Sequence, residues 1–155
     1  ADARYAPSRR VEMMLLDTNV VSELRKVGDG RADPRVVAFF SGIDQEDLYL
    51  SAITLMELEL GVTRIERRDF LQGELLRTWM SRHVIPFFHD RILPVDDAVA
   101  MCCAHLHVPD PRPERDALIA ATAIAHGLTV VTRNIADFTP MGVPTINPWE
   151  HPHST

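Results

Sequence analysis

The sequence is poor in several features that define other classes of protein. It contains two cysteines, Cys102 and Cys103, and they are adjacent. Neighbouring cysteines cannot form an ordinary disulfide with each other and there is no CxxC motif, which excludes a disulfide scaffold and a structural zinc finger. No apolar run approaches the roughly 18 residues that a membrane-spanning helix needs. These absences predict a protein of a reducing compartment, the cytoplasm, with no membrane span.

Lysine is also scarce, because Lys26 is the only one among 16 basic residues and all the others are arginines. The 22 acidic residues leave a net charge of −6, which is not the charge of a protein that coats nucleic acid. An acidic surplus leaves two alternatives, a site whose acids hold a metal ion or a basic partner. With 155 residues, 46% of them hydrophobic and 25% charged, the chain has the size and composition of one globular domain.

Strand and helix patterns alternate along the chain. Short apolar runs predict strands over residues 13–16, 48–53, 91–95, 128–132 and 145–147. Helical spacing and capping residues predict helices over residues 20–26, 34–40, 54–65, 70–83, 96–105 and 114–126. Because the strands are apolar on both faces, we expect an α/β fold, a compact α/β/α sandwich with about five parallel strands.

The expected domain covers residues 13–149. Residues 1–12 are polar and without periodicity, which is typical of a disordered tail, a native extension or an expression tag. Residues 150–155 are expected to form a frayed C-terminus. No internal repeat, P-loop or GxGxxG motif is visible.

Four acids fall at the carboxyl edge of the expected sheet. Asp17 follows the first strand, Glu57 lies in the first turn of the helix after the second, and Asp116 lies near the start of the helix before the fourth. Asp137 follows the fourth strand. Carboxylates that share a small volume repel each other unless a cation lies among them, and oxygen ligands favour Mg²⁺ or Mn²⁺. Such a site suits phosphodiester hydrolysis, because the metal orients and deprotonates a water.

Each acid also has a purely structural interpretation. Asp17 could cap the next helix, and Thr54-x-x-Glu57 is a capping box in which the glutamate reaches back to the Thr54 backbone. Asp116 is favoured in a first helical turn by the helix dipole, and Asp137 could be a surface turn residue. For any single acid the structural interpretation suffices. The predicted convergence of three acids favours a metal site.

Other candidate residues are weaker. His105 and His107 are two residues apart on a helix and point to different faces, so they are a poor metal pair. The two cysteines are most simply small buried apolar residues. A group of arginines could contact phosphates or form a solvated helix face: Arg64, Arg67 and Arg68.

Four stretches carry a family resemblance: LLDTNVVSEL (15–24), SAITLMELELG (51–61), RDALIAATAIAHGLTVVTRN (115–134) and ADF (136–138). With them the sequence resembles the PIN-domain family, in particular the VapC/FitB-like toxins of bacterial toxin–antitoxin pairs, over about residues 13–149. The resemblance implies a compact α/β/α fold, an acidic site for Mg²⁺ or Mn²⁺, and cleavage of RNA.

The resemblance also implies roles for individual residues. Asp17, Glu57 and Asp116 match the catalytic, metal-binding acids of the family. The family's fourth acidic position falls on Asn134, whose carbonyl can coordinate but brings no charge, and Asp137 lies three residues on as a replacement. The remaining matches are supporting polar residues: Asn19, Ser22 and Thr132. The departure at the fourth position concerns a second metal ion more than the first.

The resemblance implies partners as well. Family toxins form homodimers and are held inactive by a small antitoxin with a basic, DNA-binding half, so operator DNA is expected only through the antitoxin. A first alternative is a non-catalytic binding module that works through the antitoxin complex on DNA. A second alternative is an aspartyl phosphatase, since Asp17-Thr18-Asn19 follows a strand, although such enzymes need a second aspartate where Asn19 stands and a downstream lysine. The sequence does not specify which RNA is cut.

Overall fold

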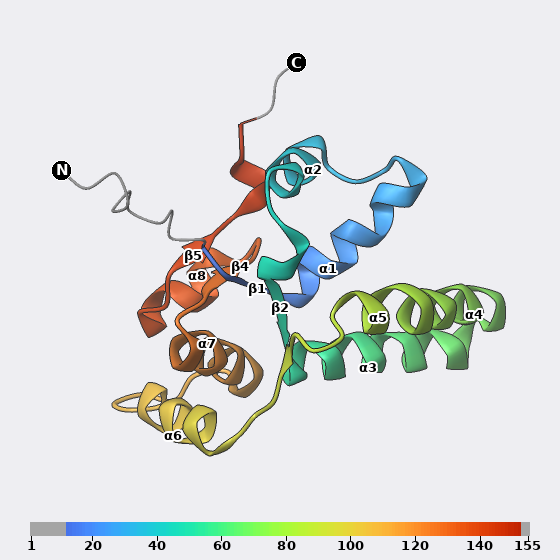
Figure 1. The fold of residues 1–155 in the computed structure, drawn as a ribbon. Coiled ribbons are helices and arrows are strands. Elements are labelled where there is room, and N and C mark those ends of the chain that lie inside the picture. Colours follow the sequence, from blue (N-terminus) through green and yellow to red (C-terminus); the bar gives the residue numbers. More distant parts are fainter. Residues whose placement is uncertain (1–11, 153–155) are drawn as a thin grey trace.

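A computed structural model, which describes residues 12–152, shows a five-stranded parallel sheet surrounded by helices (Figure 1). The strand order is β3-β2-β1-β4-β5 and every neighbouring pair is parallel. The strands are short and lie at β1 (Met14–Leu16), β2 (Leu48–Ser51), β3 (Ile92–Leu93), β4 (Thr129–Val131) and β5 (Thr145–Ile146). The expected α/β class and the five parallel strands are confirmed.

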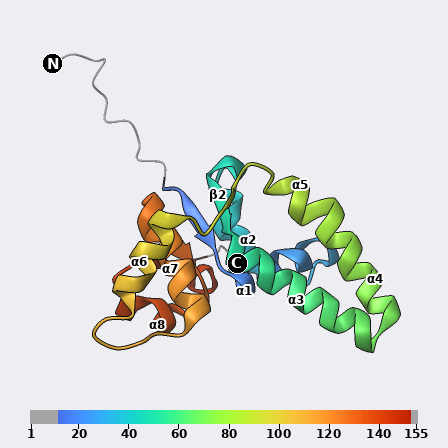
Figure 2. The ribbon, with the colours of Figure 1, turned by 90° about the horizontal axis from the view of Figure 1, so that it is seen from below.

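Helices cover both faces of the sheet, because the side chains of β1 alternate between two hydrophobic cores. Met14 and Leu16 pack in one core, whereas Leu15 packs in the other. The first core is covered by α1 (Thr18–Arg25), α2 (Pro34–Ser41), α3 (Ala52–Arg68), α4 (Phe70–Trp79) and α5 (Ile85–Phe87). The second is covered by α6 (Asp97–Leu106), α7 (Glu114–His126) and α8 (Ile135–Phe138). Figure 2 shows the α3–α4 pair and the α6–α7 pair on opposite sides of the molecule.

The helices α3 and α4 form an antiparallel hairpin that extends away from the sheet (Figure 1). Arg77 ties the two helices together, with Nη1 2.7 Å from Glu59 Oε2 and Nη2 2.9 Å from Glu66 Oε1. Gly73 lies where the two helices are in close contact, since a Cβ at this position would be 2.5 Å from Glu66 Cα. A π-helical turn (Met80–Val84) continues α4 into α5, so the predicted helix over residues 70–83 is α-helical only to Trp79.

The start of α3 differs from the prediction. Ser51 is the N-cap, and its Oγ accepts a hydrogen bond from the Ile53 backbone N–H at 3.0 Å. The helix therefore begins at Ala52, the second strand ends at Ser51 and not at Ile53, and Thr54 is buried inside the helix. The capping box Thr54-x-x-Glu57 is wrong, because a second hydroxyl residue three positions earlier takes the capping role as the strand ends.

Other boundaries agree more closely, and 3₁₀ turns lie between the main elements. The helix α7 spans residues 114–126 as predicted and ends at Gly127, which adopts a positive φ of 67°. The short α8 was not predicted. The 3₁₀ turns are Lys26–Asp29, Gln45–Asp47, Thr139–Met141 and Pro148–Glu150.

The fold continues slightly past the expected C-terminal boundary. Trp149 is buried, and the ring of His151 packs edge-on against Phe39 at a centroid distance of 5.5 Å. Residues 1–11 of the expected N-terminal tail (residues 1–12) and the last three residues (153–155) lie outside the described part of the chain. Within the described part, no helix combines the length and the apolar character needed to cross a membrane.

Candidate metal centre

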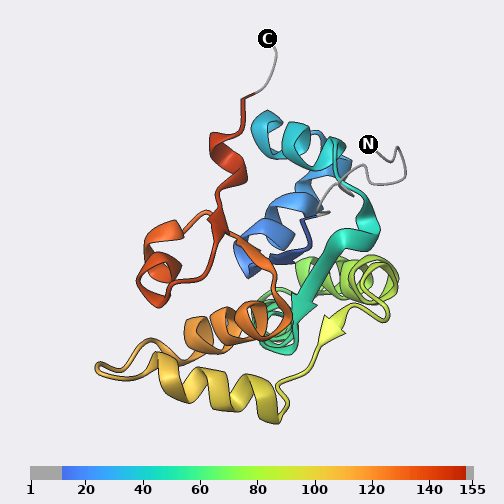
Figure 3. The same ribbon diagram turned by 60° about the vertical axis from the view of Figure 1, so that its left-hand side comes forward.

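The candidate site lies where the strand order reverses. The strand β1 is central, β2 extends the sheet on one side and β4 on the other. Loops that leave the carboxyl ends of strands at such a point diverge and leave room for a ligand. Asp17 directly follows β1, and Thr132 directly follows β4. Figure 3 shows the carboxyl end of β2 running into α3, which contacts α7.

Asp17 is buried and held by three donors. Thr132 Oγ1 donates to Asp17 Oδ2 at 2.8 Å, Asn19 Nδ2 donates to the same oxygen at 3.2 Å, and the Thr18 backbone N–H donates to Oδ1 at 2.8 Å. The last contact makes Asp17 the N-cap of α1, so the structural interpretation of this residue holds as well. Burial nevertheless raises the pKa of Asp17, with a further contribution from the charge of Glu57. The hydrogen bonds therefore only partly compensate for removing this carboxylate from water.

Glu57 points toward the end of β1. The hydroxyl of Thr18 donates to Glu57 Oε1 at 2.8 Å, although the two residues are 39 positions apart. The guanidinium of Arg115 lies near the other oxygen, with Nη1 3.8 Å from Oε2. The carboxylate is therefore engaged with residues from α1 and α7, which is the orientation that a shared site requires.

The charges of the other acids shift the pKa of Asp116. Its pKa is raised to about 6, first by burial and then by the charges of Asp17, Asp137 and Glu57. Asp137 in α8 is thus part of the same electrostatic cluster, as the sequence suggested. Four acids meet at this edge of the sheet, and the other three each raise the cost of ionising Asp116.

The predicted supporting residues surround Asp17 and Glu57. Asn19 Oδ1 accepts a hydrogen bond from the Arg133 backbone N–H at 3.1 Å, which links α1 to the loop after β4. Asn134 is the N-cap residue of α8, and its backbone N–H donates to Thr132 Oγ1 at 3.0 Å. Ser22 lines a groove that also contains Thr18 and Glu57. Thr132 therefore connects Asp17 with the loop that carries Asn134.

The chemistry of these donors fits a hard divalent cation. Every candidate ligand offers oxygen, and the pKa values of Asp17 and Asp116 are raised first by burial and further by the charges of neighbouring acids. A cation of the Mg²⁺ or Mn²⁺ type would relieve that repulsion without requiring nitrogen or sulfur ligands.

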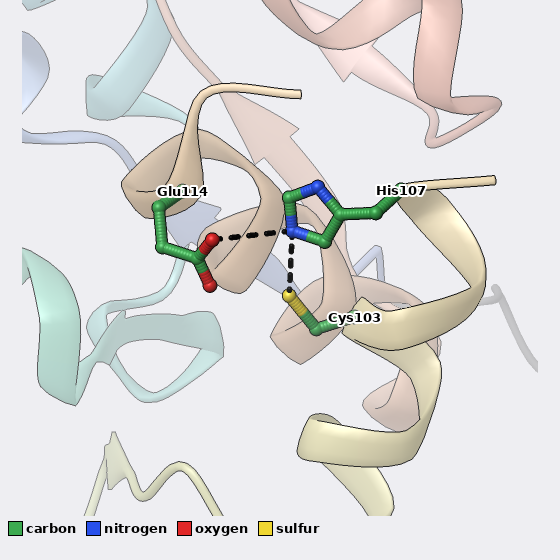
Figure 4. A group of neighbouring side chains, drawn as sticks. All are labelled: Cys103, His107 and Glu114. Carbon is green, nitrogen blue, oxygen red and sulfur yellow. Dashed lines mark hydrogen bonds and ion pairs between the residues drawn. The ribbon is translucent and has the colours of Figure 1, made fainter. Parts of the chain in front are cut away.

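A second group of side chains that could bind a metal lies between the end of α6 and Glu114, the first residue of α7. Cys103, His107 and Glu114 each present one ligand atom (Figure 4), and these atoms all lie within 4.8 Å of one another. Within residues 12–152, no three carboxylates alone form such a group. This group was not predicted from the sequence, where His107 was paired only with His105. The spacing Cys103-x₃-His107, which places both residues on one helix face, was the available signal.

Comparison with known proteins places this fold and its motifs in a family. A family model described as the PIN domain matches residues 14–138. A protein named Toxin FitB, from Neisseria gonorrhoeae, is 39% identical over 145 residues, which is 88% of this chain and 99% of that protein. VapC ribonuclease Y4jK, from Sinorhizobium fredii, is 38% identical over 146 residues, which is 89% of this chain and 99% of that protein.

A solved structure gives the same result. A chain in the structure of FitAB bound to an IR36 DNA fragment has a TM-score of 0.77 and 36% sequence identity, and the match covers 92% of this chain and 100% of that chain. The family expected from the four sequence stretches is confirmed, which favours it over the aspartyl phosphatase alternative. The chain belongs to the PIN domain family, and its relatives within that family are proteins named FitB and VapC.

Proposed function

We propose that this protein is a Mg²⁺- or Mn²⁺-dependent endoribonuclease that acts as the toxin of a toxin–antitoxin pair. The observation that carries the proposal is the convergence of Asp17, Glu57 and Asp116 at the switch point of the sheet, where their charges and burial raise the pKa of Asp116 to about 6. The names of the relatives, a toxin and a VapC ribonuclease, support the same conclusion.

The acids of the chain would hold the cation, with Asp137 and the carbonyl of Asn134 as additional oxygen donors. A bound Mg²⁺ would supply Lewis-acid chemistry, by polarising the phosphate and by lowering the pKa of a water. Thr132 and Asn19 hold Asp17 in a fixed orientation, and Thr18 holds Glu57. Pre-oriented ligands of this kind avoid the cost of reorganising the site when substrate binds.

Arg115 is the cation best placed to receive the RNA backbone. Its side chain is half exposed, and its Nη1 lies 3.8 Å from Glu57 Oε2 at the rim of the acidic cluster. A guanidinium binds phosphate oxygens bidentately, so Arg115 would position the scissile phosphate beside the acids. The acids alone would repel a polyanion, and Arg115 offsets this repulsion locally.

The groove beside Glu57 is the surface we assign to the antitoxin. It runs between α1, α3 and α4 and is lined by the charged residues Glu57 and Arg25 and by the apolar residues Leu76 and Trp79. A partner segment with apolar residues and one cation would match it, since the apolar residues would cover Leu76 and Trp79 and the cation would meet the carboxylate of Glu57. The proposed partners otherwise follow the family: a homodimer, an antitoxin with a basic DNA-binding half, and operator DNA bound through that antitoxin.

The test is cleavage of total cellular RNA by the purified chain in Mg²⁺, in Mn²⁺ and in EDTA. We expect discrete fragments that disappear in EDTA and in the variants Asp17→Ala and Asp116→Asn. The matched control is Glu74→Gln, which neutralises an exposed acid on α4 and should cleave like the wild type.

Two results would contradict the proposal. Cleavage that persists in folded Asp116→Asn would show that the acids are not the active site. No cleavage of any RNA by a folded chain that still binds an antitoxin would favour the binding-module alternative. The fragments themselves would identify the RNA and the cleavage site by end-mapping.

A further inference from the structure

A second cluster, distinct from the acidic site, lies between the end of α6 and the start of α7. Cys103 lies in the last turn of α6, His107 is the C-cap of that helix, and Glu114 is the first residue of α7. Figure 4 shows the three side chains pointing toward a common centre, with His107 Nε2 between the other two. Sulfur, imidazole nitrogen and carboxylate oxygen together are a ligand set that the nuclease proposal does not use.

Two of the three separations within the cluster, both from His107 Nε2, match those of a tetrahedral metal site. His107 Nε2 lies 3.7 Å from Cys103 Sγ and 3.4 Å from Glu114 Oε2. Bond lengths of about 2.3 Å to sulfur and about 2.0–2.1 Å to nitrogen and oxygen give tetrahedral edges of roughly 3.5 and 3.4 Å. The third pair, the Cys103 sulfur and the Glu114 carboxylate oxygen, lies within 4.8 Å, so a bound ion would have to draw only these two atoms together.

We propose that Cys103, His107 and Glu114 form a binding site for a divalent transition metal ion of the zinc class. Thiolate and imidazole ligands select such ions over Mg²⁺, so the two sites of the chain differ in the metals they accept. Cys103 is buried while Glu114 is largely exposed, so the fourth position faces solvent and accepts water or an external ligand. This proposal does not rest on the proposed nuclease activity.

The hydrogen bond at the other ring nitrogen of His107 shows what metal binding has to change. The Arg112 backbone N–H donates to His107 Nδ1 at 3.0 Å, so in the metal-free ring the proton sits on Nε2. Metal binding at Nε2 moves that proton to Nδ1, and the Arg112 amide must turn away from it. The thiol of Cys103 also loses its proton, to solvent. Binding is therefore coupled to a rearrangement of the loop between α6 and α7, which makes the site weaker than a preformed one.

The same features disfavour a catalytic cysteine. Burial raises the pKa of the Cys103 thiol, and so do the charges of Glu114 and Cys102. A nucleophilic cysteine needs a lowered pKa and a base whose lone pair faces the sulfur. Here the imidazole presents its N–H to the thiol instead. A bound dication supplies the attraction for the thiolate that the protein environment withholds.

Cobalt(II) is the probe, because a thiolate-to-cobalt charge-transfer band reports sulfur ligation and the all-oxygen acidic site cannot produce one. The full chain is titrated with Co²⁺ in excess Mg²⁺ and a non-thiol reductant, and Zn²⁺ is then added to displace the cobalt. We expect one equivalent with an intense tetrahedral visible spectrum. A chemical-shift change of the Arg112 amide should accompany it.

Variants separate the three ligands from their neighbours. Cys103→Ser should abolish the band, and His107→Gln and Glu114→Gln should weaken binding at least tenfold, since loss of even an outer-shell partner costs about 10–100-fold. Cys102→Ser and His105→Gln are matched controls that should bind like the wild type. Glu114 is exposed, so its variant keeps the test valid even if the buried cysteine variant fails to fold.

Two results would contradict the proposed metal site. Absence of the charge-transfer band in the folded wild type would leave the cluster as a hydrogen-bonded contact only. A band that survives in Cys103→Ser, or equal affinities for Glu114→Gln, His107→Gln and the wild type, would show that the ion is held elsewhere.

Discussion

Replacing Asp116 by asparagine should stabilise the fold while it abolishes cleavage. Burial and the charges of three other acids raise the pKa of Asp116 from its usual 3.8 to about 6. The difference corresponds to about 3 kcal/mol, at about 1.36 kcal/mol for each factor of ten in proton affinity. Because the side chain is only partly buried, solvent screening lowers the expected gain to about 1–2 kcal/mol at neutral pH. In melting temperature this is a rise of about 2–8 °C.

The gain in stability from Asp116→Asn depends on pH in a defined direction. In the unfolded chain Asp116 ionises near 3.8, whereas in the folded protein it keeps its proton up to about 6. The folded state therefore binds more protons between these values, and the free energy of unfolding contributed by this group falls as the pH rises through that window. Asp116→Asn should be close to the wild type in stability near the lower value and should exceed it above the upper one.

Urea denaturation in EDTA measures the difference in free energy of unfolding between Asp116→Asn and the wild type. It is done at about pH 4.5 and about pH 7.5, which lie inside and above the window of about 3.8–6. Glu74→Gln is again the control, and we expect it to leave stability unchanged at both pH values. Added Mg²⁺ should stabilise the wild type more than Asp116→Asn, because a ligand that binds only the native state shifts the folding equilibrium. An Asp116→Asn protein no more stable than the control at about pH 7.5 would refute the argument from charge repulsion.

Three further predictions rest on packing and hydrogen bonds. Gly73→Ala should destabilise the fold by about 1–3 kcal/mol in thermal unfolding, whereas Gly61→Ala, with open space around its Cβ, should be neutral or stabilising by up to about 1 kcal/mol. Thr132→Val should lower the free energy of unfolding by about 1–3 kcal/mol and reduce cleavage, because the buried carboxylate of Asp17 and the backbone N–H of Asn134 lose their partner. Thr132→Ser should restore both stability and cleavage. Ser51→Ala should cost about 0.5–2 kcal/mol as a lost cap, while Thr54→Val should be neutral or stabilising, since within residues 12–152 its hydroxyl has no partner. Equal effects at Ser51 and Thr54 would contradict the observed helix start.

The sequence by itself determined the five strands and the six longer helices, in their order, but not the short α5 and α8. Hydrophobic runs marked the strands, and short-range signals such as Asp96 before α6 and Gly127 after α7 marked the helix ends. These signals act over one to four residues, so they can be read without knowing the fold. The same locality explains the error at α3, where Ser51 and Thr54 both satisfy the capping pattern and only the end of β2 selects between them.

The sequence placed the acids at one edge of the sheet, but only the tertiary structure decided which side chains contact them there. Thr132 donates to Asp17 across 115 positions, and Thr18 donates to Glu57 across 39, because the strand order places β4 and β2 on either side of β1. Four acids with separate structural explanations thereby become one electrostatic cluster. The cluster of Cys103, His107 and Glu114 likewise depends on how α7 packs against α6. Contacts of this range follow from strand order and helix packing, which local patterns do not specify.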